Sequence, residues 1–112
     1  QFRQRQEYAR VDPALFAALL QLVFARRDEI DALMARHADR DAAQIDPVER
    51  SILCVGLAEL IGMPETPYRV IINEAVLLAH RFGAEDGHKY INALLDKAAT
   101  DVRSVERAAR EA

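Results

Sequence analysis

Acidic, imidazole and amine groups gather in one short stretch of the sequence, "EDGHKY", at residues 85–90. Glu85, Asp86 and His88 carry the side-chain types that bind divalent metals or transfer protons, and Lys89 follows directly. A metal site also needs ligands at a spacing that lets them converge, yet no HExxH, CxxC or EF-hand pattern surrounds these residues. The stretch therefore favours the polar start of a helix, and no metal or other cofactor is expected.

Candidate nucleophiles are equally scarce. The single cysteine, Cys54, lies in an apolar run, where thiols are usually inert packing groups. The sequence contains neither a Gly-rich phosphate loop nor a serine-nucleophile motif. The carboxylates of Glu49, Asp86 and Asp96 each have a structural explanation at a helix start or on a solvated face. We therefore expect no catalytic residue and no enzyme.

Lys89 and Tyr90 form the one pair of neighbours that suggests a binding function. A cation beside an aromatic ring at a helix start offers a phosphate contact and a stacking face, the two elements of single-stranded RNA recognition. Tyr90 also falls near the apolar stripe of the following helix, where most aromatic side chains are packing residues. Considered without further information, the packing role is favoured over the RNA role.

Length and composition define the setting for these residues. The 112 residues predict one domain, 1–112, with 51% hydrophobic and 29% charged residues, as in soluble globular proteins. A net charge of −3 disfavours nucleic-acid binding through bulk positive charge. One cysteine, no apolar run near the ~18 residues of a membrane span and no signal segment make the cytoplasm the expected location. The chain begins at Gln1 rather than Met, which leaves an incomplete N-terminus open.

Helical spacing of apolar residues predicts a first helical block that opens at Asp12 and Pro13, a cap residue followed by proline. The block extends to about Met34, and its charged cluster at 26–29 predicts a bend or a break. A second block opens at 46–47 and runs to about Gly62.

The second block carries a capping box, in which Asp46 caps the helix and Glu49 reaches back to the cap backbone. Within it, Gly56 should let a neighbouring helix approach closely. The third block covers residues 68–82 and is followed by Gly83 as its C′ residue. The fourth carries apolar residues from Ile91 to Val105 and runs into the charged tail. No alternating strand pattern competes, so the predicted fold class is all-α, with antiparallel helices joined by short loops.

From about residue 45 to 99 the sequence resembles the NusB family of transcription antitermination factors. The resemblance is carried by "DPVERSIL", "GLAELI" and the gap-free run "PETPYRVIINEAVLLAHRFGAEDGHKYINALLDKAA". It implies a compact NusB-like antiparallel helical bundle. It also implies an RNA-binding protein whose relatives recognise the boxA element of ribosomal RNA leader transcripts together with NusE, a ribosomal protein. That complex helps RNA polymerase to read through terminators.

The resemblance also assigns site residues. Asp86, Lys89 and Tyr90 match a family surface near the RNA, with Tyr90 in place of the usual Phe, and tyrosine keeps the stacking face. Glu49 matches an acidic position that faces NusE, and its carboxylate is expected to stay partly exposed. Gly87 replaces the usual Ser of the family pattern.

Relatives begin with an arginine-rich helix that supplies RNA contacts and part of the core, and this chain is expected to lack that helix. Arg3, Arg5 and Arg10 would then be the last residues of a basic face, or loop residues. Two consequences are expected: weaker RNA binding than in a full-length relative, and an apolar groove that invites a homodimer.

Two alternatives stay open at this point. The first is a NusB-like RNA-binding domain of an rRNA cytosine methyltransferase, which would need a long C-terminal extension with a Gly-rich cofactor-binding domain. The end of this sequence soon after "LLDKAA" favours the stand-alone factor. The second is a protein-interaction scaffold without RNA binding, which is compatible with the net charge of −3.

Overall fold

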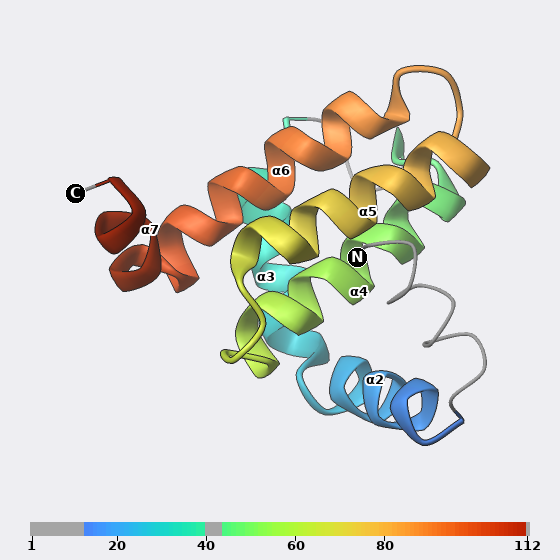
Figure 1. Ribbon diagram of the computed structural model, residues 1–112. Helices are drawn as coiled ribbons and strands as arrows, with labels where there is room; N and C mark the ends of the chain where they lie inside the picture. The colour runs from blue at the N-terminus through green and yellow to red at the C-terminus, as the bar shows by residue number, and fades with distance from the viewer. Residues whose placement is uncertain (1–12, 40–43, 112) are drawn as a thin grey trace.

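Helices joined by short turns make up the described part of the chain (Figure 1). The computed structural model describes residues 13–39 and 44–111. The helices are α2 (Pro13–Ala25), α3 (Arg27–His37), α4 (Pro47–Gly62), α5 (Tyr68–Phe82), α6 (Gly87–Val102) and α7 (Ser104–Glu111). No strand occurs within those two ranges, and the prediction of an all-α fold is confirmed.

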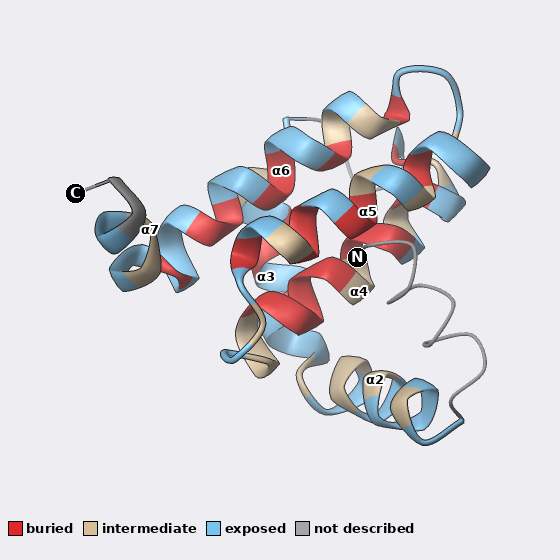
Figure 2. Ribbon diagram, in the orientation of Figure 1, coloured by how far each residue is buried: buried red, intermediate tan, exposed pale blue. Residues whose placement is uncertain are grey.

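The hydrophobic core lies where α4, α5 and α6 pack against one another, with α3 contributing from the side of α4 and α6 (Figure 2). At its centre are side chains with almost no exposed surface: Leu53, Leu57, Ile71, Ile91, Leu94 and Leu95. Gly56 permits the close approach of α6, because a Cβ at this position would lie 3.0 Å from Leu95 Cδ1. By contrast, α2 contains no buried residue and lies to one side of this core.

The helix starts and breaks in the first half of the chain agree with the sequence. The Asp46 side chain accepts hydrogen bonds from the backbone N–H groups of Val48 (3.0 Å) and Glu49 (3.2 Å), and proline occupies the first helical position of α4. The charged cluster at 26–29 does interrupt the first block, since α2 ends before Arg26 and α3 begins after it. The cap predicted at Asp12 lies outside the described residues, as do the basic residues at positions 3, 5 and 10.

The expectation of one continuous helix through the last block is wrong. The helix stops at Val102, and Arg103 has φ −128° and ψ 35° before α7 begins. Apolar residues continue at helical spacing before and after Arg103, so the sequence pattern did not predict this break. The physical reason for the break is the Arg103 side chain, which turns into the bundle and is only 7% exposed.

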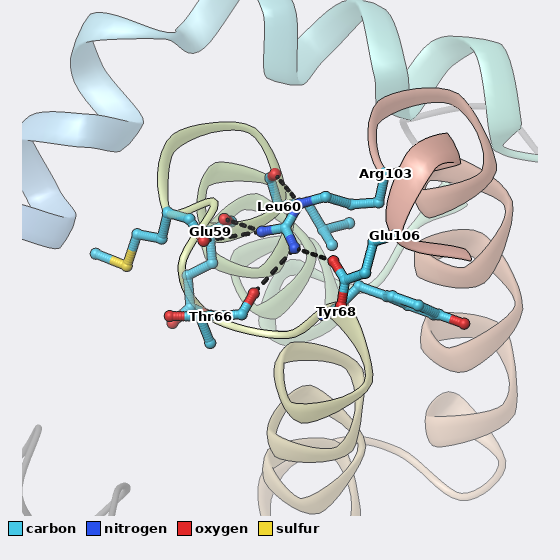
Figure 3. A network of polar contacts seen from close by, with 7 residues as sticks. Glu59, Leu60, Thr66, Tyr68, Arg103 and Glu106 are labelled. Carbon is cyan, nitrogen blue, oxygen red and sulfur yellow. Dashed lines mark hydrogen bonds and ion pairs between the residues drawn. The ribbon is translucent and has the colours of Figure 1, made fainter. Parts of the chain in front are cut away.

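Arg103 caps the end of α4 (Figure 3). Its Nε donates to the Leu60 carbonyl at 2.8 Å, and its Nη2 donates to the carbonyls of Met63 at 2.9 Å and Glu59 at 3.3 Å. The last carbonyls of a helix lack partners within the helix, and a guanidinium has enough donors for several of them at once. Arg103 thus gives the Leu60 carbonyl a donor and adds a second donor to the carbonyls of Glu59 and Met63, which also accept from backbone N–H groups.

The same guanidinium also reaches the start of α5. Its Nη1 donates to the Thr66 carbonyl at 2.9 Å and to Glu106 Oε1 at 2.7 Å, while Glu106 Oε2 accepts from the backbone N–H of Tyr68 at 3.0 Å. Tyr68 is the first residue of α5. Arg103 and Glu106 thus tie the α4–α5 connection to the junction of α6 and α7. This network depends on residues about 40 positions apart, which is why local sequence patterns did not reveal it.

Within the described ranges, every helix is too short or too polar to cross a membrane.

Candidate functional site

The turn between α5 and α6 positions the polar stretch of residues 85–90. The backbone N–H of Gly83 donates to the Ala79 carbonyl at 2.8 Å and ends α5, but Gly83 itself is extended, with φ −87° and ψ 171°. The left-handed residue is Asp86, with φ 70° and ψ −1°, and it is the N-cap of α6. Asp86 is therefore a helix-boundary residue as predicted, although its side chain makes no capping hydrogen bond.

Asp86 and Lys89 are brought together on the surface. Lys89 Nζ lies 3.4 Å from Asp86 Oδ1, and the two side chains are 72% and 70% exposed. Exposed pairs of this kind contribute little to stability, about 0–1 kcal/mol, because water and salt screen them. The ammonium can therefore exchange this partner for another anion at little cost.

Tyr90, the third predicted RNA contact, is half-buried. Its ring packs against the hydrophobic core and its hydroxyl oxygen is buried. The packing role that was favoured from the sequence is thus confirmed for this residue, whereas its RNA role stays a prediction.

Glu49 differs from expectation, since only 4% of it is exposed. The expectation of a partly exposed carboxylate is therefore wrong. The physical reason is that Gly87 has no side chain: a Cβ there would lie 2.2 Å from Glu49 Oε2, so the carboxylate occupies that space at the start of α6. One half of the predicted capping box is present, since Asp46 accepts from the backbone N–H of Glu49. The return bond from the Glu49 side chain is not seen, because that carboxylate lies beside Gly87 at the start of α6.

An apolar groove of about 450 Å³ runs between α2, α4 and α5. Its apolar walls include Leu19, Leu20, Ile52, Val55, Leu78 and Phe82, and the carboxylate residues Glu59 and Glu74 also line it. On its rim, Phe16 is 57% exposed and Phe82 is 60% exposed. The groove expected from the sequence is present, and its occupation by a second copy of the chain stays a prediction.

The candidate nucleophile and metal ligands can also be placed. Cys54 is half-buried, and burial raises the pKa of its thiol, opposed in part by the nearby charge of Arg50. A thiol held in its neutral form is a poor nucleophile. Across the two described ranges, His, Cys, Asp and Glu side chains do not gather in groups of three or more that could hold a metal ion.

Fold and surfaces together define an all-helical bundle protein with a charged helix start at one end and an apolar groove along one side. The pattern described as the NusB family matches residues 2–100. The chain belongs to the NusB family. This membership supports the expectation that the chain is not an enzyme.

Three relatives illustrate the similarity, each named "Transcription antitermination protein NusB". The protein from Thiobacillus denitrificans is 47% identical over 104 residues, which are 93% of this chain and 72% of the relative. The one from Hydrogenovibrio crunogenus is 49% identical over 107 residues, 96% of this chain and 66% of the relative. The one from Nitrosococcus oceani is 48% identical over 101 residues, 90% of this chain and 68% of the relative. The alignments thus leave 28% to 34% of each relative unmatched.

Proposed function

We propose that this chain is a transcription antitermination factor that recognises a boxA-type element of ribosomal RNA leader transcripts. In this proposal it acts together with the ribosomal protein NusE and helps RNA polymerase to read through terminators in the cytoplasm. The observation that carries the proposal is the family match over residues 2–100, with relatives near half identity that bear the antitermination name.

The RNA-binding surface in this proposal is the start of α6, with Asp86, Lys89 and Tyr90 as its contacts. Support comes from the exposure of Asp86 and Lys89 and from the weakness of the pair they form. Lys89 would contact a phosphate, and the Asp86 carboxylate would accept hydrogen bonds from exocyclic base amines. The half-buried Tyr90 would present only part of its ring to RNA, because it packs against the core and its hydroxyl oxygen is buried.

For the protein partner, we propose a surface around the start of α4. Glu49 is buried there, so its contribution to partner binding would be indirect, through the position of the neighbouring backbone. Val48, next to it, is 42% exposed and offers an apolar contact on the same helix turn.

Titration of the full chain with a short boxA-type RNA tests this proposal, with and without the ribosomal protein. We expect binding that strengthens when the partner is present, because the two ligands use adjacent surfaces of one scaffold. Partner binding without any RNA binding would favour a pure protein-interaction scaffold and contradict the RNA assignment. The matched variants are Lys89→Ala and Lys97→Ala, since these are the chain's two lysines and both lie on α6.

A further inference from the structure

His80 and His88 stack on each other across the turn that joins α5 to α6. Their ring centroids are 4.0 Å apart and the ring planes are inclined by 25°. His80 comes from the last turn of α5 and is exposed, whereas His88 comes from the first turn of α6 and is half-buried. Neither residue was assigned a role from the sequence, because a helix end separates the two along the chain.

A cation follows each of the two stacked histidines in the sequence. Lys89 follows His88, and its side chain is 72% exposed. Arg81 follows His80, is exposed, and has its guanidinium carbon 5.7 Å from the centre of the Phe82 ring. Acidic groups are present as well, since Asp86 pairs with Lys89 and Glu85 is exposed in the turn. Two stacked aromatic rings are thus each followed in sequence by an exposed cation, and rings with nearby cations are the combination that proteins use to stack bases and contact phosphates of single-stranded nucleic acid.

The stack also offers an exposed aromatic ring, whereas Tyr90 is half-buried. The tyrosine hydroxyl is buried and the side chain packs against the core, so Tyr90 is only partly accessible to a base. His80 is exposed and is held in place by the ring behind it. Holding a side chain in its binding geometry before the ligand arrives reduces the ordering cost of binding.

We propose that the His80–His88 stack is the base-stacking platform of the RNA surface, with an unpaired base continuing the stack on the outer face of His80. Lys89 and Arg81 then contact phosphates on either side of that base. The inference rests on the proposed function, because it takes single-stranded RNA as the ligand. It gives a role to two residues that had none from the sequence, and it moves the stacking role from Tyr90 to the imidazole pair.

Fluorescence titration of the full chain with short boxA-type RNAs, each carrying 2-aminopurine at one position, tests the stack directly. Stacking on an aromatic ring should quench one of these probes. His80→Ala should abolish that quenching and weaken binding about 5- to 100-fold, in line with the loss of one stacked base. His80→Phe keeps a flat ring and should restore both the quenching and most of the affinity. His37→Ala is the matched control, because this third histidine pairs with Asp101 on another part of the bundle.

The outcomes separate this inference from the function on which it rests. If the wild type binds RNA and Lys89→Ala weakens it while His80→Ala changes neither affinity nor quenching, the stack is overturned and the RNA surface stands. If His80→Phe binds as poorly as His80→Ala, a ring nitrogen is the contact and stacking is overturned. If the wild type binds no RNA with or without the ribosomal protein, the proposed function fails and the inference fails with it.

Discussion

The Glu49 carboxylate fills the space that a side chain at position 87 would need, since a Cβ on Gly87 would lie 2.2 Å from Glu49 Oε2. The two residues belong to the first turns of α4 and α6. Non-bonded heavy atoms do not approach that closely, so any larger residue at position 87 must displace the carboxylate. The contact therefore sets how near the two helix starts can lie, and with it the position of the exposed pair of Asp86 and Lys89.

This contact predicts energetic coupling between positions 49 and 87. Gly87→Ala should destabilise the wild-type chain, because the new methyl group displaces a buried carboxylate. In a Glu49→Ala background the same change should be neutral or stabilise by up to about 1 kcal/mol, since alanine is the better helix former. Urea unfolding of the four proteins should give a coupling energy of about 0.5–3 kcal/mol. Equal effects of Gly87→Ala in both backgrounds would contradict the contact.

Arg103→Ala should be among the most damaging single substitutions in this chain. It removes the donors that Arg103 supplies to carbonyls at the end of α4 and to the Glu106 carboxylate, and it breaks a buried ion pair, at a cost of about 3–5 kcal/mol. Arg103→Lys keeps the charge but cannot reproduce the planar fork, so it should recover only part of this loss. Arg36→Ala removes a pair with Asp101 in which the arginine is 66% exposed, and should change the free energy of unfolding by less than about 1 kcal/mol. Similar losses for Arg103→Ala and Arg36→Ala would refute the network.

Lys89→Ala should lower both RNA affinity and its dependence on salt. A phosphate contact releases about one condensed counterion, so the slope of log affinity against log salt should fall by about 0.7 for single-stranded RNA. Stability should hardly change, because the pair with Asp86 is exposed. Lys97→Ala should leave the salt slope unaltered. A slope equal to that of the wild type in both variants would remove Lys89 from the RNA surface.

Asp101 predicts a pH dependence of stability on the acid side. Hydrogen bonds from His37 and Arg36 hold the pKa of this carboxyl below its ordinary value. A folded pKa below the unfolded value of about 3.9 stabilises the fold above that pH, and the contribution is lost as pH falls through the folded pKa. Asp101→Asn should therefore reduce the loss of stability between about pH 5 and pH 2. Thermal unfolding across that range measures it, with Glu65→Gln as an exposed carboxyl control. If Asp101→Asn lost as much stability as the wild type between about pH 5 and pH 2, the interaction of Asp101 with His37 and Arg36 would be contradicted.

The groove between α2, α4 and α5 predicts self-association of the 112-residue chain. Exposed rings on its rim are the kind of apolar surface that soluble proteins cover. Phe16→Ser, which replaces a rim side chain that is 57% exposed, should shift sedimentation toward the monomer without lowering stability. Val105→Ser, at a position that is 84% exposed on α7 and not part of the groove, is the matched control. A monodisperse wild-type monomer at high concentration would rule out the second copy as occupant.

Local patterns were sufficient for most of the helices. The Asp46–Pro47 start, the third helix over 68–82 and the break near Arg26 all depend on neighbours within one or two turns, and each was predicted correctly. Gly83 was rightly placed at the end of its helix. The left-handed conformation fell instead on Asp86, which no rule based on glycine would select.

Features that join distant segments were missed. The burial of Glu49 depends on the absence of a side chain at position 87, and the two are far apart in sequence. The break at Arg103 arises because its guanidinium finds carbonyls near residue 60, which a helical pattern over 91–105 does not reveal. The His80–His88 stack likewise needs the geometry of the intervening turn. The sequence therefore predicted which residues belong to the candidate site, but not how their side chains are arranged in space.

The position of Arg103 has a consequence for dissecting this protein. The match to the NusB family ends at residue 100, shortly before the guanidinium that completes α4. A fragment that ended at residue 100 would contain nearly all of the core, but it would lose the hydrogen bonds from Arg103 to the end of α4 and to the α4–α5 connection. The family pattern thus ends before Arg103 and Glu106, and a fragment that keeps this network has to include both residues.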